Sequence, residues 1–353
     1  MPLSAVDAMT PAFQHAKQQL FQPFRFGQWV RLAIVGFFAG ELGSGGGNFG
    51  GGGPSNQGAG TPTMPHIDPA LLAALITTLV LAAVILIPLF IYLNSMFRFV
   101  LFDSVVKKQC HIREYWSRRT RPGFRYFLWQ ISLVLCSLLV MAVLVGIPVV
   151  IALAAGWFKQ PREHLLPLIL GGILMFFVFV GLIIAMAVIA VFTKDFVVPQ
   201  MALEDISAVD GWRRLWAMIK AEKGGFLAYI GMKIVLAIGA SIVIGLASLI
   251  LILIVLIPVG GVGVAAVIMA KAAGAGWNAM TITAVIVGAC VVLALIIFLV
   301  ALISVPAIVF FPAYSIHFFA ARYLPLYNLM HPAPPPAAVP LPFIPPPEPS
   351  PAG

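Results

Sequence analysis

Long apolar segments alternate with short polar connections along the chain and predict a series of membrane-spanning helices. The segments lie near residues 28–42, 70–96, 126–156, 166–192, 226–257 and 281–312. A helix needs about 20 apolar residues to cross the hydrocarbon of a bilayer. The first segment is short, because only LAIVGFFAGEL follows Arg31 before a glycine tract begins. We expect it either to cross with help from neighbouring residues, with Glu41 at its outer end, or to lie in the interface as a re-entrant segment.

Composition agrees with this pattern. Of the 353 residues, 61% are hydrophobic and only 9% are charged, and the mean hydropathy is +1.04. A soluble chain of this length is typically about 25% charged. The predicted fold class is therefore all-α: a polytopic transmembrane helical bundle of about six spans.

The distribution of Lys and Arg predicts the orientation. The N-terminal stretch through Arg31 holds three, residues 98–125 hold eight, and residues 194–223 hold five. The connections expected on the other side hold fewer, with none in 43–69 and two in 157–165. Because positively charged connections stay on the cytoplasmic side, we expect a multi-pass protein of the cytoplasmic (inner) membrane with both termini in the cytoplasm.

The chain divides into three expected regions. Residues 1–27 form a cytoplasmic N-terminus with a short amphipathic segment and no cleavable signal, and residues 28–331 form the transmembrane domain. That domain includes a glycine-rich outer loop, 43–69, whose composition is typical of a flexible connection. Residues 332–353 are proline-rich and are expected to form an extended cytoplasmic tail.

The segment 203–225 gathers eight charged residues beside two tryptophans. Ser207 followed by Asp210 predicts a helix cap. Beyond the cap, the apolar residues fall on one helical arc at spacings of three, four and seven: Val209, Trp212, Leu215, Trp216 and Ile219. This arc either lies in the headgroup layer of the membrane or packs on the protein's own helices.

A similar aromatic and basic segment occurs earlier in the chain. The chain leaves one span at Phe99 and re-enters the membrane near Tyr126, and it leaves another at Phe196 and re-enters near Tyr229. We interpret this as a weak internal repeat of two amphipathic cytoplasmic helical hairpins. The residues predicted to contact anionic lipid headgroups or a membrane partner are Trp116, Arg118, Arg119, Trp212, Arg213, Arg214, Trp216 and Lys220.

The spans carry little that could support chemistry. Ala237, Ser241 and Gly245 recur every four residues and predict a helix-packing seam, within one chain or between copies in a homo-oligomer. Lys233 is close enough to the predicted interface to reach it with its amine. His317 has no evident partner, and no nucleophile, metal-ligand spacing or phosphate-binding motif is present. We therefore expect no catalytic residue, no cofactor, no metal and no nucleic-acid partner.

Several motifs suggest a family. The run DFVVPQMALED with GWRRLW and GGFLAYIGMKIVLA, preceded by RFVLFD and followed by PAYSIHFFAARYLP, resembles an uncharacterised family of bacterial multi-span proteins. That family is distantly similar to the membrane domain of some glycerophosphodiester phosphodiesterases. The soluble hydrolase domain of those enzymes has no counterpart here, so the resemblance implies a fold and not a reaction.

Two functions follow from this pattern. The first is a non-enzymatic membrane scaffold whose cytoplasmic hairpins contact anionic lipid or a membrane partner. The alternative is a transporter or flippase that moves an amphipathic, lipid-like substrate between the two hairpins. Prolines at 88, 148 and 258 within the spans are the feature that favours transport.

Overall fold

A computed structural model describes residues 3–41, 69–157, 164–272 and 279–331, and these ranges are helical apart from short connections, with no strand among them. The predicted all-α class is confirmed. The glycine-rich loop and the proline-rich tail lie outside the described residues. The helices are α1 (Met9–Phe21), α2 (Phe26–Phe38), α3 (Pro69–Val106), α4 (Ile112–Arg118), α5 (Thr120–Met141), α6 (Ile147–Ala154), α7 (Leu165–Phe192), α8 (Val198–Glu204), α9 (Ala208–Ala221), α10 (Lys223–Ala272), α11 (Ala279–Ala320) and α12 (Leu324–Met330).

Five helical segments are long and apolar enough to cross a membrane. Their apolar stretches carry no charged side chain to interrupt them, so lipid can surround the helices without an unpaired charge at depth. α5 continues into α6 through a π turn, and Pro148 follows directly in the first turn of α6. The segments are Ile76–Val106, Thr120–Ala154, Leu165–Glu204, Lys223–Ala266 and Thr283–Ala320.

The predicted span 28–42 is corrected by the structure. α2 has 13 residues, which is about 20 Å of helix and less than the hydrocarbon thickness. Glu41, expected at the outer end of this span, instead lies 3.1 Å from Arg98 and also pairs with Lys194. Arg98 belongs to α3 and Lys194 to the π turn after α7, so the end of α2 lies against these two segments. In the described part of the chain, five helices long and apolar enough to span a membrane and one shorter apolar helix stand where six spans were predicted.

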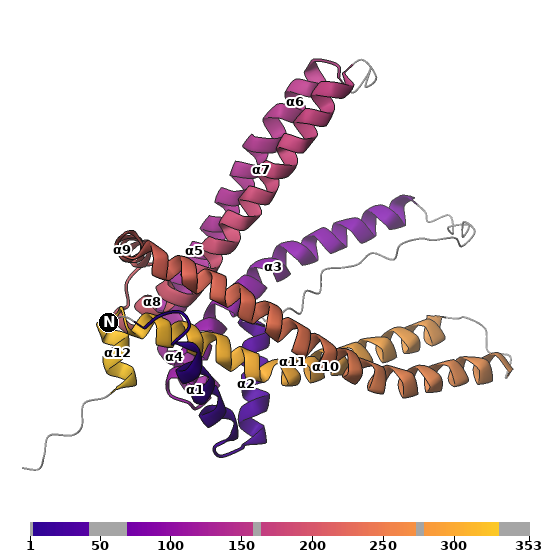
Figure 1. The fold of residues 1–353 in the computed structure, drawn as a ribbon. Helices are drawn as coiled ribbons and strands as arrows, with labels where there is room; N and C mark the ends of the chain where they lie inside the picture. Colours follow the sequence, from indigo (N-terminus) through magenta and orange to yellow (C-terminus); the bar gives the residue numbers. More distant parts are fainter. Residues whose placement is uncertain (1–2, 42–68, 158–163, 273–278, 332–353) are drawn as a thin grey trace, which may run out of the picture.

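The spans extend as three arms from a common body (Figure 1). One arm is α3, the second is α5 and α6 beside α7, and the third is α10 beside α11. We call the common body the hub; it consists of α1, α2, α4, α8, α9 and α12 together with the adjoining ends of the five long segments. In the arms, at most 11% of the residues in the most apolar stretch of each segment are buried. Almost all of the packed core therefore lies in the hub, and the arms present apolar surface for lipid.

Both ends of the described chain pack on the hub. Tyr314, near the end of α11, donates a hydrogen bond of 2.9 Å to the carbonyl of Ala5, and Arg322 donates one of 3.1 Å to the carbonyl of Leu3. α1, α12 and the two basic connections thus belong to the hub, from which the α5–α7 arm and the α10–α11 arm extend in different directions (Figure 1).

Matching ring contacts support the weak internal repeat. Phe99 and Tyr126 meet with ring centres 5.9 Å apart, and Phe196 and Tyr229 meet at 5.0 Å. All four side chains are buried. Gly123 and Gly225 lie at matching places, in the first turns of α5 and α10. An aromatic pair at matching positions therefore joins the exit of each hairpin to its re-entry.

Candidate functional site

The helix predicted in the opening charged segment is present as α9, and its cap forms as expected. The Ser207 hydroxyl accepts a hydrogen bond of 3.2 Å from the Asp210 backbone N–H and donates one of 2.6 Å to the Asp210 carboxylate. This arrangement satisfies a backbone donor that the first helical turn leaves open. The predicted cap is confirmed.

One side of α9 packs on the base of the α7 arm. The indole N–H of Trp212 donates a hydrogen bond of 2.9 Å to the Thr193 hydroxyl, and Leu215 is fully buried. A Cβ placed on Gly211 would lie 2.7 Å from Val197, so this glycine permits close approach of the two segments. Trp212, predicted to contact lipid or a partner, is half-buried and packs partly on the protein's own helices, and its contact with lipid or a partner stays a prediction.

A second side of α9 is exposed. Val209 and Trp216 are each 54% exposed, the Arg213 side chain is 79% exposed, and Lys220 is exposed. These four residues are spaced by four, three and four positions, so they form one line along the helix; we call this line the α9 stripe. The Lys220 amine lies 5.7 Å from the centre of the Trp216 ring. The predicted single arc is thus divided between a buried face and an exposed stripe.

Arg214 does not belong to the stripe. Its guanidinium forms an ion pair with Glu204, and the Tyr323 hydroxyl donates a hydrogen bond of 2.5 Å to the same carboxylate. The hydrogen bond with Glu204, followed by its charge, raises the pKa of Arg214. Burial, followed by the hydrogen bond with Glu204, raises the pKa of Tyr323. Arg214 therefore links α9 to α8 and the start of α12.

The predicted contact residues of the first hairpin are also divided. Trp116 is half-buried, and its ring lies 5.2 Å from that of Phe97. Arg119 donates hydrogen bonds of 2.8 and 2.9 Å to the two carboxylate oxygens of Asp103. Arg118 alone faces outward, in an exposed ion pair with Glu114. Such exposed pairs contribute little stability, so its charge is available at the surface.

The predicted packing seam has no neighbouring helix at its outer end. Ala237 and Ser241 are half-buried. The Ser241 hydroxyl donates a hydrogen bond of 2.7 Å to the carbonyl of Ile238 in its own helix. A Cβ on Gly245 would meet nothing within 4 Å. A contact between two copies of the chain at this seam stays a prediction.

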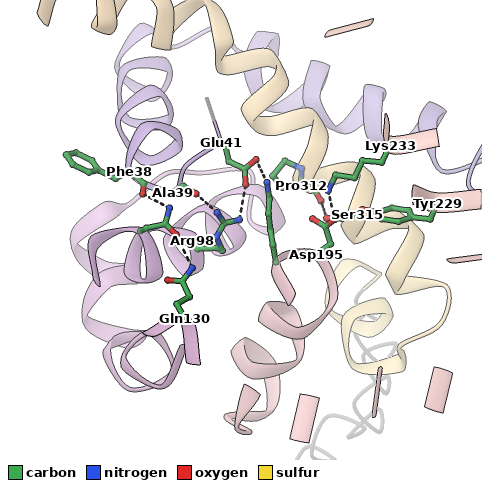
Figure 2. A network of polar contacts seen from close by, with 12 residues as sticks. Phe38, Ala39, Glu41, Arg98, Gln130, Asp195, Tyr229, Lys233, Pro312 and Ser315 are labelled. Carbon is green, nitrogen blue, oxygen red and sulfur yellow. Dashed lines mark hydrogen bonds and ion pairs between the residues drawn. The ribbon is translucent and has the colours of Figure 1, made fainter. Parts of the chain in front are cut away.

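A network of buried charges forms the centre of the hub (Figure 2). Arg98 on α3 donates a hydrogen bond of 3.1 Å to Glu41 and another to the carbonyl of Ala39, and Lys194 pairs with the second oxygen of Glu41. The Glu41 side chain is fully buried. The network therefore fixes the end of α2 against the hub ends of α3 and α7.

The same centre contains a second buried pair. Lys233 on α10 pairs with Asp195, and Tyr229 donates a hydrogen bond of 2.9 Å to this carboxylate (Figure 2). Lys233 was expected to reach the interface, but its side chain is only 11% exposed. No spacing in the sequence could reveal its partner, because Asp195 is 38 positions away. Buried charges are stable only when paired and hydrogen-bonded, and here both conditions hold.

Polar side chains continue from this network toward the α5–α7 arm. Asn94 donates a hydrogen bond of 3.1 Å to the carbonyl of Phe38, and Gln130 donates one of 3.4 Å to the Asn94 oxygen. The Ser95 hydroxyl in turn donates a hydrogen bond of 2.6 Å to the Gln130 side-chain oxygen. These amides border a cavity of about 500 Å³ between α2, α3, α5 and α7.

Two histidines meet where α1 packs on α11. The rings of His15 and His317 are 5.5 Å apart, edge to face, and one His15 ring nitrogen lies 2.8 Å from the carbonyl of Val105. Burial lowers the pKa of His15, and the nearby charge of Lys108 lowers it further, against the opposing effect of the Val105 carbonyl. His317, which has no sequence neighbour to pair with, therefore has a ring partner from the N-terminal helix.

Comparison with known families places the chain. A model for a family of unknown function, DUF7544, matches residues 3–327, so the chain belongs to this family. Neither a curated protein nor a solved structure matches the chain. The similarity to the membrane domain of glycerophosphodiester phosphodiesterases therefore stays an expectation from sequence motifs.

Proposed function

We propose that this chain is a non-enzymatic integral protein of the cytoplasmic membrane that acts as a scaffold in contact with anionic lipid. Its hub lies on the cytoplasmic side with both termini, and the three arms extend into the bilayer. The α9 stripe carries the lipid contact. The same surface could receive a membrane-protein partner or a second copy.

The position and composition of the α9 stripe support this proposal most strongly. The buried face of α9 packs on Thr193 and Val197, where the apolar stretch of α7 ends and the hub begins. The neighbouring exposed stripe therefore lies near the level where hydrocarbon gives way to headgroups. A tryptophan flanked by Arg213 and Lys220 is typical of a helix in that layer.

Transport is less well supported. Residues 73–93, 131–154, 165–192, 234–266 and 283–312 contain no charged side chain. Carriers that move charged or strongly polar groups usually place ionisable residues at membrane depth. The charges of the hub are paired with one another, as in Lys233 with Asp195, so the described spans provide no polar route between the hairpins.

Lipid retention tests the scaffold proposal. The full-length protein would be placed in nanodiscs of mixed anionic and neutral phospholipid, and the lipids that remain after detergent extraction would be quantified. Each cation near an anionic surface contributes about 1 kcal/mol. The double variant Arg213→Gln/Lys220→Gln should therefore retain less anionic lipid, with the loss largest at low salt.

A matched control removes the same charge from another part of the hub. Lys17→Gln/Arg25→Gln lies outside the stripe, on α1 and just before α2, and should retain anionic lipid almost as well as the unmodified chain. Equal retention by both double variants would contradict the assignment of lipid contact to α9.

A further inference from the structure

The cavity between α2, α3, α5 and α7 is polar at one end and apolar at the other. Its hub-side end is bordered by Gly40 and by the amides of Asn94 and Gln130. Moving outward along the helices, its walls become Phe90 on α3 and Val134 on α5, with Met186 on α7. A cavity of about 500 Å³ is within the range of small-molecule sites, and its polarity changes along its length.

An unpartnered donor lines this cavity. The indole N–H of Trp129 is buried and has no hydrogen-bond partner among the described residues. A buried N–H without a partner is unfavourable, and nearly all such groups in proteins are paired. The Trp129 ring belongs to the wall of the cavity, so a ligand in the cavity could supply the missing acceptor.

A neighbouring amide also offers a donor. Asn94 uses one amide hydrogen on the Phe38 carbonyl, and Gln130 uses one on the Asn94 oxygen. The Gln130 oxygen already accepts a hydrogen bond from Ser95. Since each amide nitrogen carries two hydrogens, the second hydrogen of Asn94 can be donated to a ligand oxygen. The polar end therefore suits a ligand group that accepts hydrogen bonds.

The apolar end defines the rest of the ligand. Val134 is 44% exposed on the outer surface of α5, so this wall is continuous with the lipid-facing surface of the arm. A soluble polar metabolite would find no partners there, whereas an acyl chain could extend from the cavity into the bilayer. We propose that the cavity binds one glycerolipid molecule. Its acyl chain lies against Phe90 and Met186, and its ester or phosphate oxygens accept hydrogen bonds from Trp129 and the Asn94 amide.

This site is separate from the α9 stripe. The stripe contacts the headgroup layer from outside the hub, whereas the cavity lies between α3 and the α5–α7 arm. Either assignment can fail without the other. In particular, Arg213→Gln/Lys220→Gln should leave occupancy of the cavity unchanged.

Photo-crosslinking tests the lipid site. The full-length protein would be reconstituted in nanodiscs that contain a diacyl phospholipid with a diazirine on one acyl chain, and labelled peptides would be identified by mass spectrometry. We expect labelling of α3, α5 and α7 peptides that line the cavity. Trp129→Phe keeps an aromatic ring but removes the N–H, and the loss of one hydrogen bond should lower this labelling about five-fold.

A larger side chain in the cavity wall provides a second, independent test. Ala190→Trp places a large side chain in the cavity wall, while Ala185→Trp, on the same helix, is exposed and does not line the cavity. Ala190→Trp should remove most labelling of the cavity peptides, and Ala185→Trp should leave it intact. If Ala190→Trp does not fold, Trp129→Phe decides alone. Equal labelling of the cavity peptides in the unmodified chain and in Trp129→Phe would overturn the proposal, and so would equal labelling in the two tryptophan insertions.

Discussion

Lys233 on α10 and Asp195 in the π turn after α7 form a buried ion pair. Tyr229 donates to the same carboxylate, and its ring stacks on Tyr314 with centres 5.2 Å apart. The pair thus joins the base of the α7 arm to the base of the α10–α11 arm. Because the arms share little buried surface farther out, contacts of this kind in the hub determine how the spans are held together.

Removal of one member of this pair should destabilise the fold strongly. Lys233→Met leaves the Asp195 carboxylate buried without its cation, and such changes cost about 3–5 kcal/mol. Lys223→Met, at the exposed first residue of α10, should change stability little. Reversible unfolding in mixed micelles would measure both. If Lys233→Met were as stable as Lys223→Met, the buried pair would not be a structural link.

The double variant Lys233→Met/Asp195→Asn separates the ion pair from simple loss of packing. With both charges gone, no unpaired charge remains, so we expect it to be more stable than Lys233→Met alone. A double variant less stable than the single one would mean that Asp195 is held mainly by Tyr229 and not by Lys233.

Close packing of α2 on α11 gives a second prediction. A Cβ on Gly36 would lie 2.5 Å from the side chain of Ile308, which is fully buried. Gly36→Ala should therefore destabilise the protein by about 1–3 kcal/mol through overpacking. A Cβ on Gly231 in α10 would meet nothing within 4 Å, so Gly231→Ala should be neutral or stabilising. Thermal unfolding of the two variants would test the contrast, and a neutral Gly36→Ala would count against the tight α2–α11 contact.

Much of the fold could be predicted from local sequence. The five long spans are signalled by uninterrupted apolar runs, and the α9 cap by Ser207 and Asp210. These features depend on residues close together in the chain. The predictions that were wrong involve residues whose partners lie far away in the sequence. α2 resembled a weak span because nothing near Glu41 indicates that it pairs with Arg98 and Lys194.

The division of the α9 arc shows the same limitation within one helix. Periodicity places Trp212 and Trp216 on similar sides, four positions apart. Only the position of Thr193, which accepts from Trp212, and the space left at Trp216 decide which tryptophan packs partly on the protein's own helices. The cavity beside Trp129 was also missed, because its walls come from four separate helices.

Burial of His15 predicts pH-dependent stability. Its pKa is lowered chiefly by burial, so the folded state binds fewer protons than the unfolded state near the ordinary histidine pKa of 6.5. The stabilisation is complete above that value and decreases as the pH falls below it. The protein should therefore unfold at a lower temperature at pH 5 than at pH 7. His15→Gln should reduce this difference, whereas exposed His331→Gln should not; equal differences in the two variants would contradict the role of His15.

The arrangement of hub and arms predicts which residues share a side of the membrane. Ser117 on α4 and Leu324 on α12 are exposed on the hub, and Ala155 follows α6 at the tip of the α5–α7 arm. In a chain lacking native cysteines, cysteines at the first two positions should react with an impermeant reagent only after cells are opened. Ala155→Cys should react in intact cells. The Lys and Arg alternation also predicts outside labelling at Ser55, which lies outside the described residues. Labelling of Ser117→Cys from outside would contradict a cytoplasmic hub.

The most direct test of the proposed function measures how deep the α9 stripe lies in the membrane. Nitroxide labels would be attached to Val209→Cys, within the stripe, and to Ala221→Cys, at the exposed last residue of α9 and turned away from the stripe. In nanodiscs rich in anionic lipid, we predict strong relaxation of the Val209 label by a headgroup-anchored paramagnetic lipid. The Ala221 label should respond mainly to a water-soluble relaxant. If both labels respond equally to the water-soluble relaxant, whatever the lipid charge, α9 does not contact the membrane and the scaffold account is contradicted.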